Sequence, residues 1–202
     1  MGKRPLAAVL IAAFLLAGCA GTFRSDYPEA VPPETSRDWR VAEVRAITYD
    51  SRSVSEDNIL VPFADIVWHG EPPGDRRAQV AAIVAEGVRE AAAGLDGPRP
   101  VEIHIAVDRF HGVTPVAINR SPGAVHDLTF RAAVVDRATR EVLVPPTRID
   151  AALIAYTQRA AVISRLNGET ERQRIVDHVA ALTAGWLGTG PDVRGSFQSI
   201  GR

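Results

Sequence analysis

The sequence has few of the residues and none of the patterns that usually assign a reaction. Its 202 residues include one cysteine and one methionine, so an intramolecular disulfide is excluded. No Cys/His cluster has zinc-finger spacing. There is also no Walker A loop, dinucleotide-binding glycine pattern, Gly-x-Ser-x-Gly elbow or His-Glu-x-x-His sequence. Motifs alone therefore name no reaction, cofactor or ligand.

Neither sign of charge is in excess. The chain has 23 basic and 24 acidic residues, for a formal net charge of −1. Lys3 is the only lysine, and the 22 arginines are scattered along the whole chain. A nucleic-acid partner therefore has no electrostatic support. With 46% hydrophobic and 23% charged residues, the composition is that of an ordinary globular protein and argues against general disorder.

The apolar run near the N-terminus is too short to cross a bilayer. It extends over eleven residues, Leu6 to Leu16, whereas a membrane-spanning helix needs about 20. Lys3 and Arg4 precede the run and small residues follow it, which is typical of a secretory signal peptide. We therefore expect residues 1–18 to be a leader that is removed.

The single cysteine stands directly after this run. Leu16-Ala17-Gly18-Cys19 resembles the bacterial lipobox, in which the thiol is diacylated, the chain is cut before the cysteine and the new amino group is acylated. The resemblance implies that acylated Cys19 holds the protein at the lipid bilayer, since each buried CH₂ contributes about 0.8 kcal/mol. An Asp after the cysteine tends to retain such lipoproteins at the inner membrane. Ala20 here favours the outer membrane, facing the periplasm. The alternative is a plain signal peptide or membrane anchor in which Cys19 is incidental.

Two segments of the mature chain lack hydrophobic periodicity. Residues 20–38 are rich in Pro, Ser, Thr and Asp, which predicts a lipidated, flexible tether over 19–38. Residues 188–202 are rich in Gly and Ser and are predicted to be a flexible tail. A single domain over 39–187 is left between them. Without Lys3 and Arg4 the chain has 21 basic and 24 acidic residues, so its net charge of −3 predicts no attraction to lipid headgroups.

Hydrophobic periodicity within 39–187 predicts an α+β domain. Apolar residues at helical spacing predict one amphipathic helix from Asp75 to Gly94 and another from Thr170 to Gly188. Alternating patterns predict strands over 39–49, 99–113, 123–136, 141–144 and 149–156. This order favours an antiparallel sheet with two amphipathic helices packed on one face.

The most suggestive polar group contains His104, Asp108, His111, His126 and Asp127. His104 and Asp108 share the polar face of one predicted strand, and His126 would lie nearby if the two long strands pair. His104, Asp108 and His126 could then bind a divalent metal or serve a small periplasmic hydrolase. The exposed face of a one-sided antiparallel sheet is polar in any case. A solvated surface with neither metal nor cofactor is therefore the preferred interpretation.

A second candidate is Trp68 with His69, just before the rigid turn at Pro72 and Pro73. An aromatic side chain beside a rigid loop could anchor a protein partner. A tryptophan that follows Ile66-Val67 is more often a core residue, so the sequence leaves both interpretations open.

Three stretches together resemble a known family. They are Asp65-Ile66-Val67-Trp68 running through Gly74-Asp75-Arg76 to Gln79-Val80, then Val107–His111, then Gly123–Leu128. They resemble an uncharacterised lipoprotein family of alphaproteobacteria, a domain of unknown function, over most of 39–187. The order of elements is more distantly similar to periplasmic auxiliary lipoproteins of lipid-transport systems and to the N-terminal domain of the Tol system's soluble component. Fold does not fix function, and the resemblance implies no activity.

From all of this we expect a non-enzymatic lipoprotein of the cell envelope that acts as a binding or auxiliary subunit. Its expected partner is an envelope protein.

Overall fold

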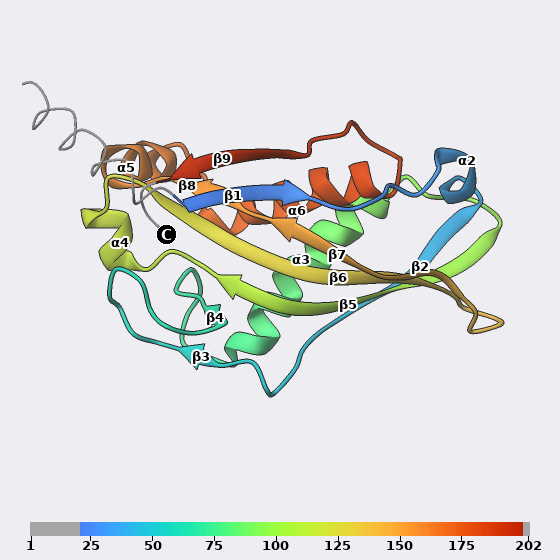
Figure 1. The fold of residues 1–202 in the computed structure, drawn as a ribbon, viewed down its shortest axis with the longest axis horizontal. Helices are drawn as coiled ribbons and strands as arrows, with labels where there is room; N and C mark the ends of the chain where they lie inside the picture. Colours follow the sequence, from blue (N-terminus) through green and yellow to red (C-terminus); the bar gives the residue numbers. More distant parts are fainter. Residues whose placement is uncertain (1–20, 200–202) are drawn as a thin grey trace, which may run out of the picture.

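The computed structural model describes residues 21–199, so the predicted leader and Cys19 lie outside the described residues. Figure 1 shows a long, twisted sheet with helices on one side and at both ends. The strands are β1 (Gly21–Asp26), β2 (Trp39–Thr48), β3 (Val54–Ser55), β4 (Ile66–Val67), β5 (Arg99–His111), β6 (Ala124–Asp136), β7 (Val142–Ala151), β8 (Leu153–Ala155) and β9 (Gly195–Ser199). The helices are α2 (Pro33–Ser36), α3 (Arg76–Ala92), α4 (Pro115–Arg120), α5 (Gln158–Leu166) and α6 (Glu171–Trp186).

The sheet is mixed, which corrects the antiparallel prediction. β5, β6 and β7 form an antiparallel meander, but β2 pairs with β5 in parallel, as do β4 with β5 and β3 with β4. The chain leaves β2, passes through α3 on one face and returns to β5, and such a crossover makes neighbouring strands parallel. Alternation of apolar residues identifies a strand but not its direction. The sequence therefore did not reveal that β2, β3 and β4 run parallel to β5.

Helices α3 and α6 begin where the sequence predicts. The Asp75 side chain accepts a hydrogen bond from the Ala78 backbone N–H at 3.1 Å, and the Thr170 hydroxyl accepts one from the Gln173 N–H at 3.1 Å. These caps satisfy backbone donors that the first helical turn leaves free. Both helices pack on the apolar face of the sheet and form the main core with it. The core side chains include Val101, Ile103, Ile105 and Val107 of β5, Leu128, Phe130 and Val134 of β6, Val80, Ile83, Val84 and Val88 of α3, and Ile175, Val176, Val179, Leu182 and Trp186 of α6.

The segments predicted as tether and tail contain strands, so those two predictions are wrong for the described residues. β1 pairs antiparallel with both β7 and β9, and β9 is therefore part of the same sheet. The rings of Phe23 and Phe197 stack at 5.9 Å beside Val125, and Tyr27 is buried in the main core. Neither segment is periodic enough to predict alone, because each obtains its stability from a partner far away in the sequence.

Residues 21–199 contain more helices than the two that the sequence predicts. α2, α4 and α5 are short, and α4 and α5 lie together at the end of the molecule where β1 begins (Figure 1). Within the described residues, no helix is long and apolar enough to cross a membrane.

Helices α3 and α6 pack closely at Gly87, where a side chain would have no room. A Cβ at Gly87 would lie 2.7 Å from the Val176 carbonyl oxygen and 2.8 Å from Val179 Cβ. Because overpacking forces backbone shifts, we expect Gly87→Val to lower the free energy of unfolding by about 1–3 kcal/mol. Urea denaturation measures this loss. Gly94→Val is the matched control because a Cβ there meets nothing within 4 Å. An equal loss in both variants would contradict the packing argument.

Candidate functional site

The face of the sheet opposite α3 and α6 carries charged side chains from neighbouring strands. We call it the polar face, and it includes Arg45 of β2, Glu102, His104 and Asp108 of β5, Asp127, Thr129 and Arg131 of β6, and Arg148 and Asp150 of β7. Successive residues of a strand point to opposite sides, so the apolar residues that face the helices leave these ones on the other side. The polar face is therefore a direct consequence of the core.

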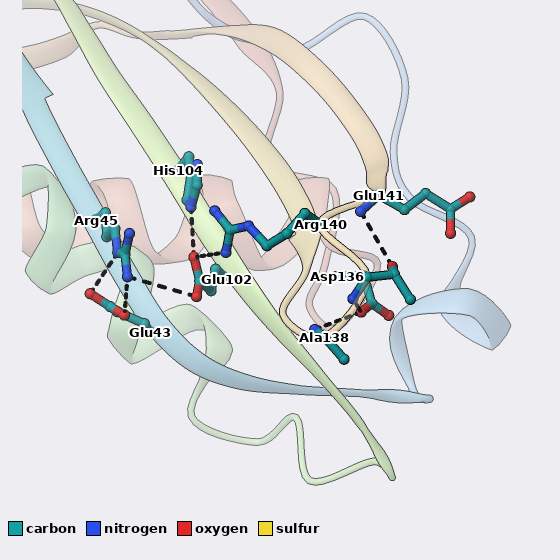
Figure 2. Close-up of polar contacts among 9 residues, drawn as sticks. Glu43, Arg45, Glu102, His104, Asp136, Ala138, Arg140 and Glu141 are labelled. Carbon is teal, nitrogen blue, oxygen red and sulfur yellow. Dashed lines mark hydrogen bonds and ion pairs between the residues drawn. The ribbon is translucent and has the colours of Figure 1, made fainter.

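Glu102 is the most enclosed carboxylate on this face, with a side chain only 4% exposed. It accepts hydrogen bonds from His104 Nε2 at 2.9 Å and Arg140 Nη1 at 2.9 Å, as Figure 2 shows. Arg45 Nη2 lies 3.8 Å from its other oxygen and is itself held by Glu43. The hydrogen bond from His104, followed by that from Arg140, lowers the pKa of Glu102 to about 2. Glu102 is thus an ionised carboxylate that accepts both hydrogen bonds at one oxygen, Oε2.

Arg140 reaches Glu102 because the β6–β7 turn places it there. The Asp136 carboxylate accepts hydrogen bonds from the backbone N–H groups of Thr139 at 2.8 Å and of Ala138 at 2.9 Å (Figure 2). It also accepts one from Arg99 Nε at 2.6 Å. The bonds from Thr139 and Arg99 hold the pKa of Asp136 well below its usual range. Arg140 has a positive φ of 63°, a strained conformation that this closed turn maintains.

Asp108 lies further along β5 and is held by two guanidinium groups. Its oxygens accept hydrogen bonds from Arg52 at 2.5 Å and from Arg131 at 2.8 Å. Burial alone raises the pKa of Asp108, but the Arg131 and Arg52 guanidinium groups outweigh it and the pKa is lowered. Ion pairs of Arg109 with Asp127 and of Arg148 with Asp150 continue the same pattern. Opposite charges on the polar face therefore pair with one another.

Two hollows indent the polar face. One, of about 480 Å³, lies beside the start of β1 and is lined by Arg109, Asp127, Thr129, Arg148 and Asp150. The other, of about 350 Å³, is more apolar and is lined by residues that include Ile47, Tyr49, Arg131, Val142 and Pro146. Ile47, Tyr49 and Val142 are among the exposed large apolar side chains of the described chain. This second hollow combines an aromatic ring, aliphatic groups and an arginine.

The structure does not bring His104, Asp108 and His126 together. His126 has the parity of Leu128 and Phe130, so it points to the helix side of the sheet and is only 1% exposed. Its Nδ1 accepts a hydrogen bond from the Val113 N–H at 3.3 Å, which leaves Nε2 to donate to Glu171 at 2.8 Å. That parity was already visible in the sequence. Within 21–199 no group of three or more His, Cys, Asp or Glu could hold a metal ion.

Glu171 is part of a compact polar contact on the helix side. Burial raises the pKa of its carboxyl group, but hydrogen bonds from His126 and Arg174 outweigh this and lower the pKa on balance. Arg174 also stacks on the Tyr156 ring at 3.5 Å. Because both ring nitrogens of His126 have partners, the arrangement orients α6 and β8 and leaves no free imidazole nitrogen at this point.

Trp68 and His69 have different environments. Trp68 is buried, packs edge-on against Phe110 at 5.4 Å and donates from Nε1 to Glu71 at 2.8 Å, so it has the position of a core residue. His69 is half-buried and lines a hollow of about 320 Å³ between α4, α5 and the start of α6. Its Nε2 is buried and has no hydrogen-bond partner in the described part of the chain. His111 is buried, and its Nε2 lies 2.8 Å from the Pro62 carbonyl oxygen.

The Glu102 contacts predict how stability depends on pH. A carboxyl group whose folded pKa is lowered stabilises the fold above its unfolded pKa of about 4.3, and this contribution is lost as the pH falls toward 2. We expect Glu102→Gln to be less stable than wild type at pH 7, with the difference shrinking between pH 5 and pH 2. Urea denaturation at pH 7, 5 and 3 measures this. The exposed Glu90→Gln is the control, and a Glu102→Gln difference that stays constant with pH would contradict the argument.

Comparison with solved structures shows only distant likeness. A variant PelC dodecamer from Paraburkholderia phytofirmans aligns with a TM-score of 0.37 and 13% identity, covering 83% of this chain and 97% of that one. A "putative lipoprotein" from Caulobacter crescentus aligns with a TM-score of 0.35 and 12% identity, covering 79% and 97%. At these TM-scores neither protein indicates a function for this chain.

Comparison with known sequences is more informative about family than about activity. No curated protein matches the chain. One family model matches residues 39–202, which include every strand and helix from β2 onward. The resemblance to a family of unknown function is thereby confirmed, whereas its alphaproteobacterial source and the lipid anchor stay predictions. The chain belongs to the Family of unknown function (DUF6778).

Proposed function

We propose that the chain is a lipid-anchored protein of the bacterial cell envelope. Acylated Cys19 would hold it at the outer membrane, and the domain would face the periplasm as a non-enzymatic binding or auxiliary subunit of an envelope complex. The observation that carries the proposal is the sequence Leu16-Ala17-Gly18-Cys19, which directly follows a short apolar run and holds the only cysteine of the chain.

The position of Cys19 relative to the fold supports this proposal. β1 starts at Gly21, two residues after Cys19, and β1 lies between β7 and β9 in the sheet. A group attached to Cys19 would therefore be joined directly to the sheet. Such a connection suits an anchor that has to hold a folded domain at a surface.

A binding role suits the polar groups of the domain better than an enzymatic one. Glu102, Asp108 and Asp136 accept hydrogen bonds from arginines. Ser25 and His178 lie 2.9 Å apart, but the Ser25 hydroxyl donates to the Ala152 carbonyl oxygen at 2.9 Å. Since a hydroxyl has a single proton, Ser25 is not poised to give it to His178. These contacts favour structural roles.

The apolar hollow on the polar face is the surface that best fits a protein partner. Tyr and Arg are enriched in interfaces, and Tyr49 and Arg131 both line this hollow beside Ile47 and Val142. The paired charges around it would fix the orientation of a partner, because complementary charges determine specificity and the rate of encounter. We assign the envelope partner to this surface.

The anchor is tested by Cys19→Ser. Serine offers no thiol for diacylation, so we expect wild-type protein to fractionate with membranes and to resist high salt, which removes only electrostatically bound proteins. The variant should accumulate as an uncleaved precursor or appear in the soluble periplasmic fraction. Mass spectrometry of wild type should find acyl groups on Cys19. Wild-type protein that lacks this mass, or that salt washes from the membrane, would contradict the proposal.

The partner surface is tested by photo-crosslinking in intact cells. A photoreactive phenylalanine at Tyr49 should yield one defined crosslinked product, because Tyr49 is exposed at the apolar hollow. The same substitution at Glu90, an exposed position on α3, is the matched control and should yield none. A product from Glu90 together with none from Tyr49 would place the partner on the helical face and refute the assignment.

A further inference from the structure

Helix α5 has its apolar residues on the outside. Val162, Ile163 and Leu166 are all exposed, Leu166 to 80%, and Arg159 lies one turn earlier on the same stripe. The helix buries only two of its nine residues, both small: Ala161 and Ser164. A hollow of about 320 Å³ is lined by residues of α5, α4 and the start of α6. A helix that serves only the core buries its apolar stripe, and α5 does the reverse.

A second apolar group lies in the loop between β3 and β4. Ile59, Leu60, Val61 and Phe63 are exposed, and Phe63 is fully so. The loop backbone is nevertheless fixed. The Thr114 hydroxyl donates to the Ile59 carbonyl oxygen at 2.6 Å, the Val116 N–H donates to Asn58 at 2.9 Å, and His111 contacts the Pro62 carbonyl oxygen at 2.8 Å. The loop thus holds apolar side chains in water at a conformation set by the domain.

Both groups lie at the end of the domain where β1 begins. Gly21 pairs with Ser199, and a Cβ at Gly123 would lie 3.6 Å from the Ser199 hydroxyl. The Gln158 side chain at the start of α5 donates to the Ser121 carbonyl oxygen at 3.1 Å. Figure 1 shows the start of β1, α4, α5 and the loop between β3 and β4 at the same end, the left one in this view.

The chain that precedes β1 determines what this end can reach. Cys19 is two residues before Gly21, and two extended residues span about 7 Å at most. If Cys19 is acylated, as the proposed function states, this end cannot move far from the headgroup region. An apolar helix face at a membrane interface is buried about 5–10 Å into the headgroup and acyl boundary. An anchor on Cys19 would therefore keep this end of the domain close to the interface.

The two short helices at this end carry a positive charge that suits an anionic lipid surface. α4 and α5 carry Arg120, Arg159 and Arg165 and contain no acidic residue. Interfacial helices combine arginine with large apolar residues in this way. The loop between β3 and β4 differs, because Glu56, Asp57 and Asp65 lie in it, so the excess of arginine belongs to the two helices alone.

We propose that α5 and the loop between β3 and β4 form a membrane-docking surface. Val162, Ile163, Leu166 and Phe63 would enter the interface of a bilayer that contains anionic phospholipid. Arg120, Arg159 and Arg165 would contact its headgroups. Together with the anchor, this surface would fix the orientation of the domain on the membrane. The β6–β7 turn would then point away from the membrane. The inference rests on the proposed function.

The test uses mature lipidated protein, from Cys19 onward, purified from membranes and reconstituted in vesicles of phosphatidylethanolamine and phosphatidylglycerol. Leu166→Cys and Phe63→Cys are labelled singly with a thiol-reactive nitrobenzoxadiazole dye. Ala138→Cys, in the exposed β6–β7 turn at the other end of the sheet, is the matched control. All three positions are exposed, so the labels should not disturb folding, and thermal unfolding checks this.

The emission of the dye at Leu166 and at Phe63 should shift to the blue in the vesicles. Spin-labelled lipid should quench most of this fluorescence. Dye at Ala138 should do neither. Quenching at Leu166 should weaken when phosphatidylcholine replaces phosphatidylglycerol, and equal quenching would overturn the assignment to anionic lipid. Unquenched dye at Leu166 or Phe63 overturns the docking surface. A blue shift without quenching indicates burial against protein, such as a second copy, and also overturns it.

Wild-type protein separates failure of the docking surface from failure of the anchor. Its sole cysteine is Cys19, so acylated wild-type protein should take up no dye. Dye on wild type would show a free thiol at Cys19 and refute the proposed function. Unlabelled wild type, with unquenched dye at Leu166 and Phe63, would refute docking while leaving the anchor intact.

Discussion

The pairing of β5 with β6 determines where the other parts of this domain face. The two strands have thirteen residues each and place Val, Ile, Leu and Phe toward α3 and α6. The alternate residues, among them Glu102 and Asp127, then have to face the other way. A slip of one residue in either strand would exchange the two faces, burying charge and exposing the core. One ladder therefore fixes both the core and the polar face.

A register shift in this ladder keeps the apolar residues inward over its full length. Strict alternation from Val107 would place Arg109 among the helices and leave Phe110 outside. The shift between Val107 and Arg109 returns Phe110 to the inner face, where it contacts Trp68. Such a bulge adds a residue to one strand and changes the direction of the side chains after it. Asp108 and Arg109 thereby remain outside, where they pair with Arg131 and Asp127.

The ends of the sheet differ in how they use charge and apolar surface. At the β6–β7 turn, Asp136 organises backbone donors and places Arg140 against Glu102, so ionised groups stabilise one another there. At the opposite end, α5 contributes little to the core and keeps large apolar groups in water. The net charge of the whole chain is near zero and reveals neither arrangement. It sums the paired charges of the polar face with the unbalanced arginines of the two short helices α4 and α5.

The sequence by itself determined the elements whose pattern is local. The leader pattern around Cys19, the starts of α3 and α6 at Asp75 and Thr170, and the long strands β5 and β6 depend on neighbours within a few residues. The polar character of the face with His104 and Asp108 followed from the same alternation. Only the tertiary structure decided the parallel direction of β2, the pairing of β1 with β9 and the contact of Glu102 with Arg140. These join residues far apart in the sequence, and their stability exists only once the core has brought the strands together.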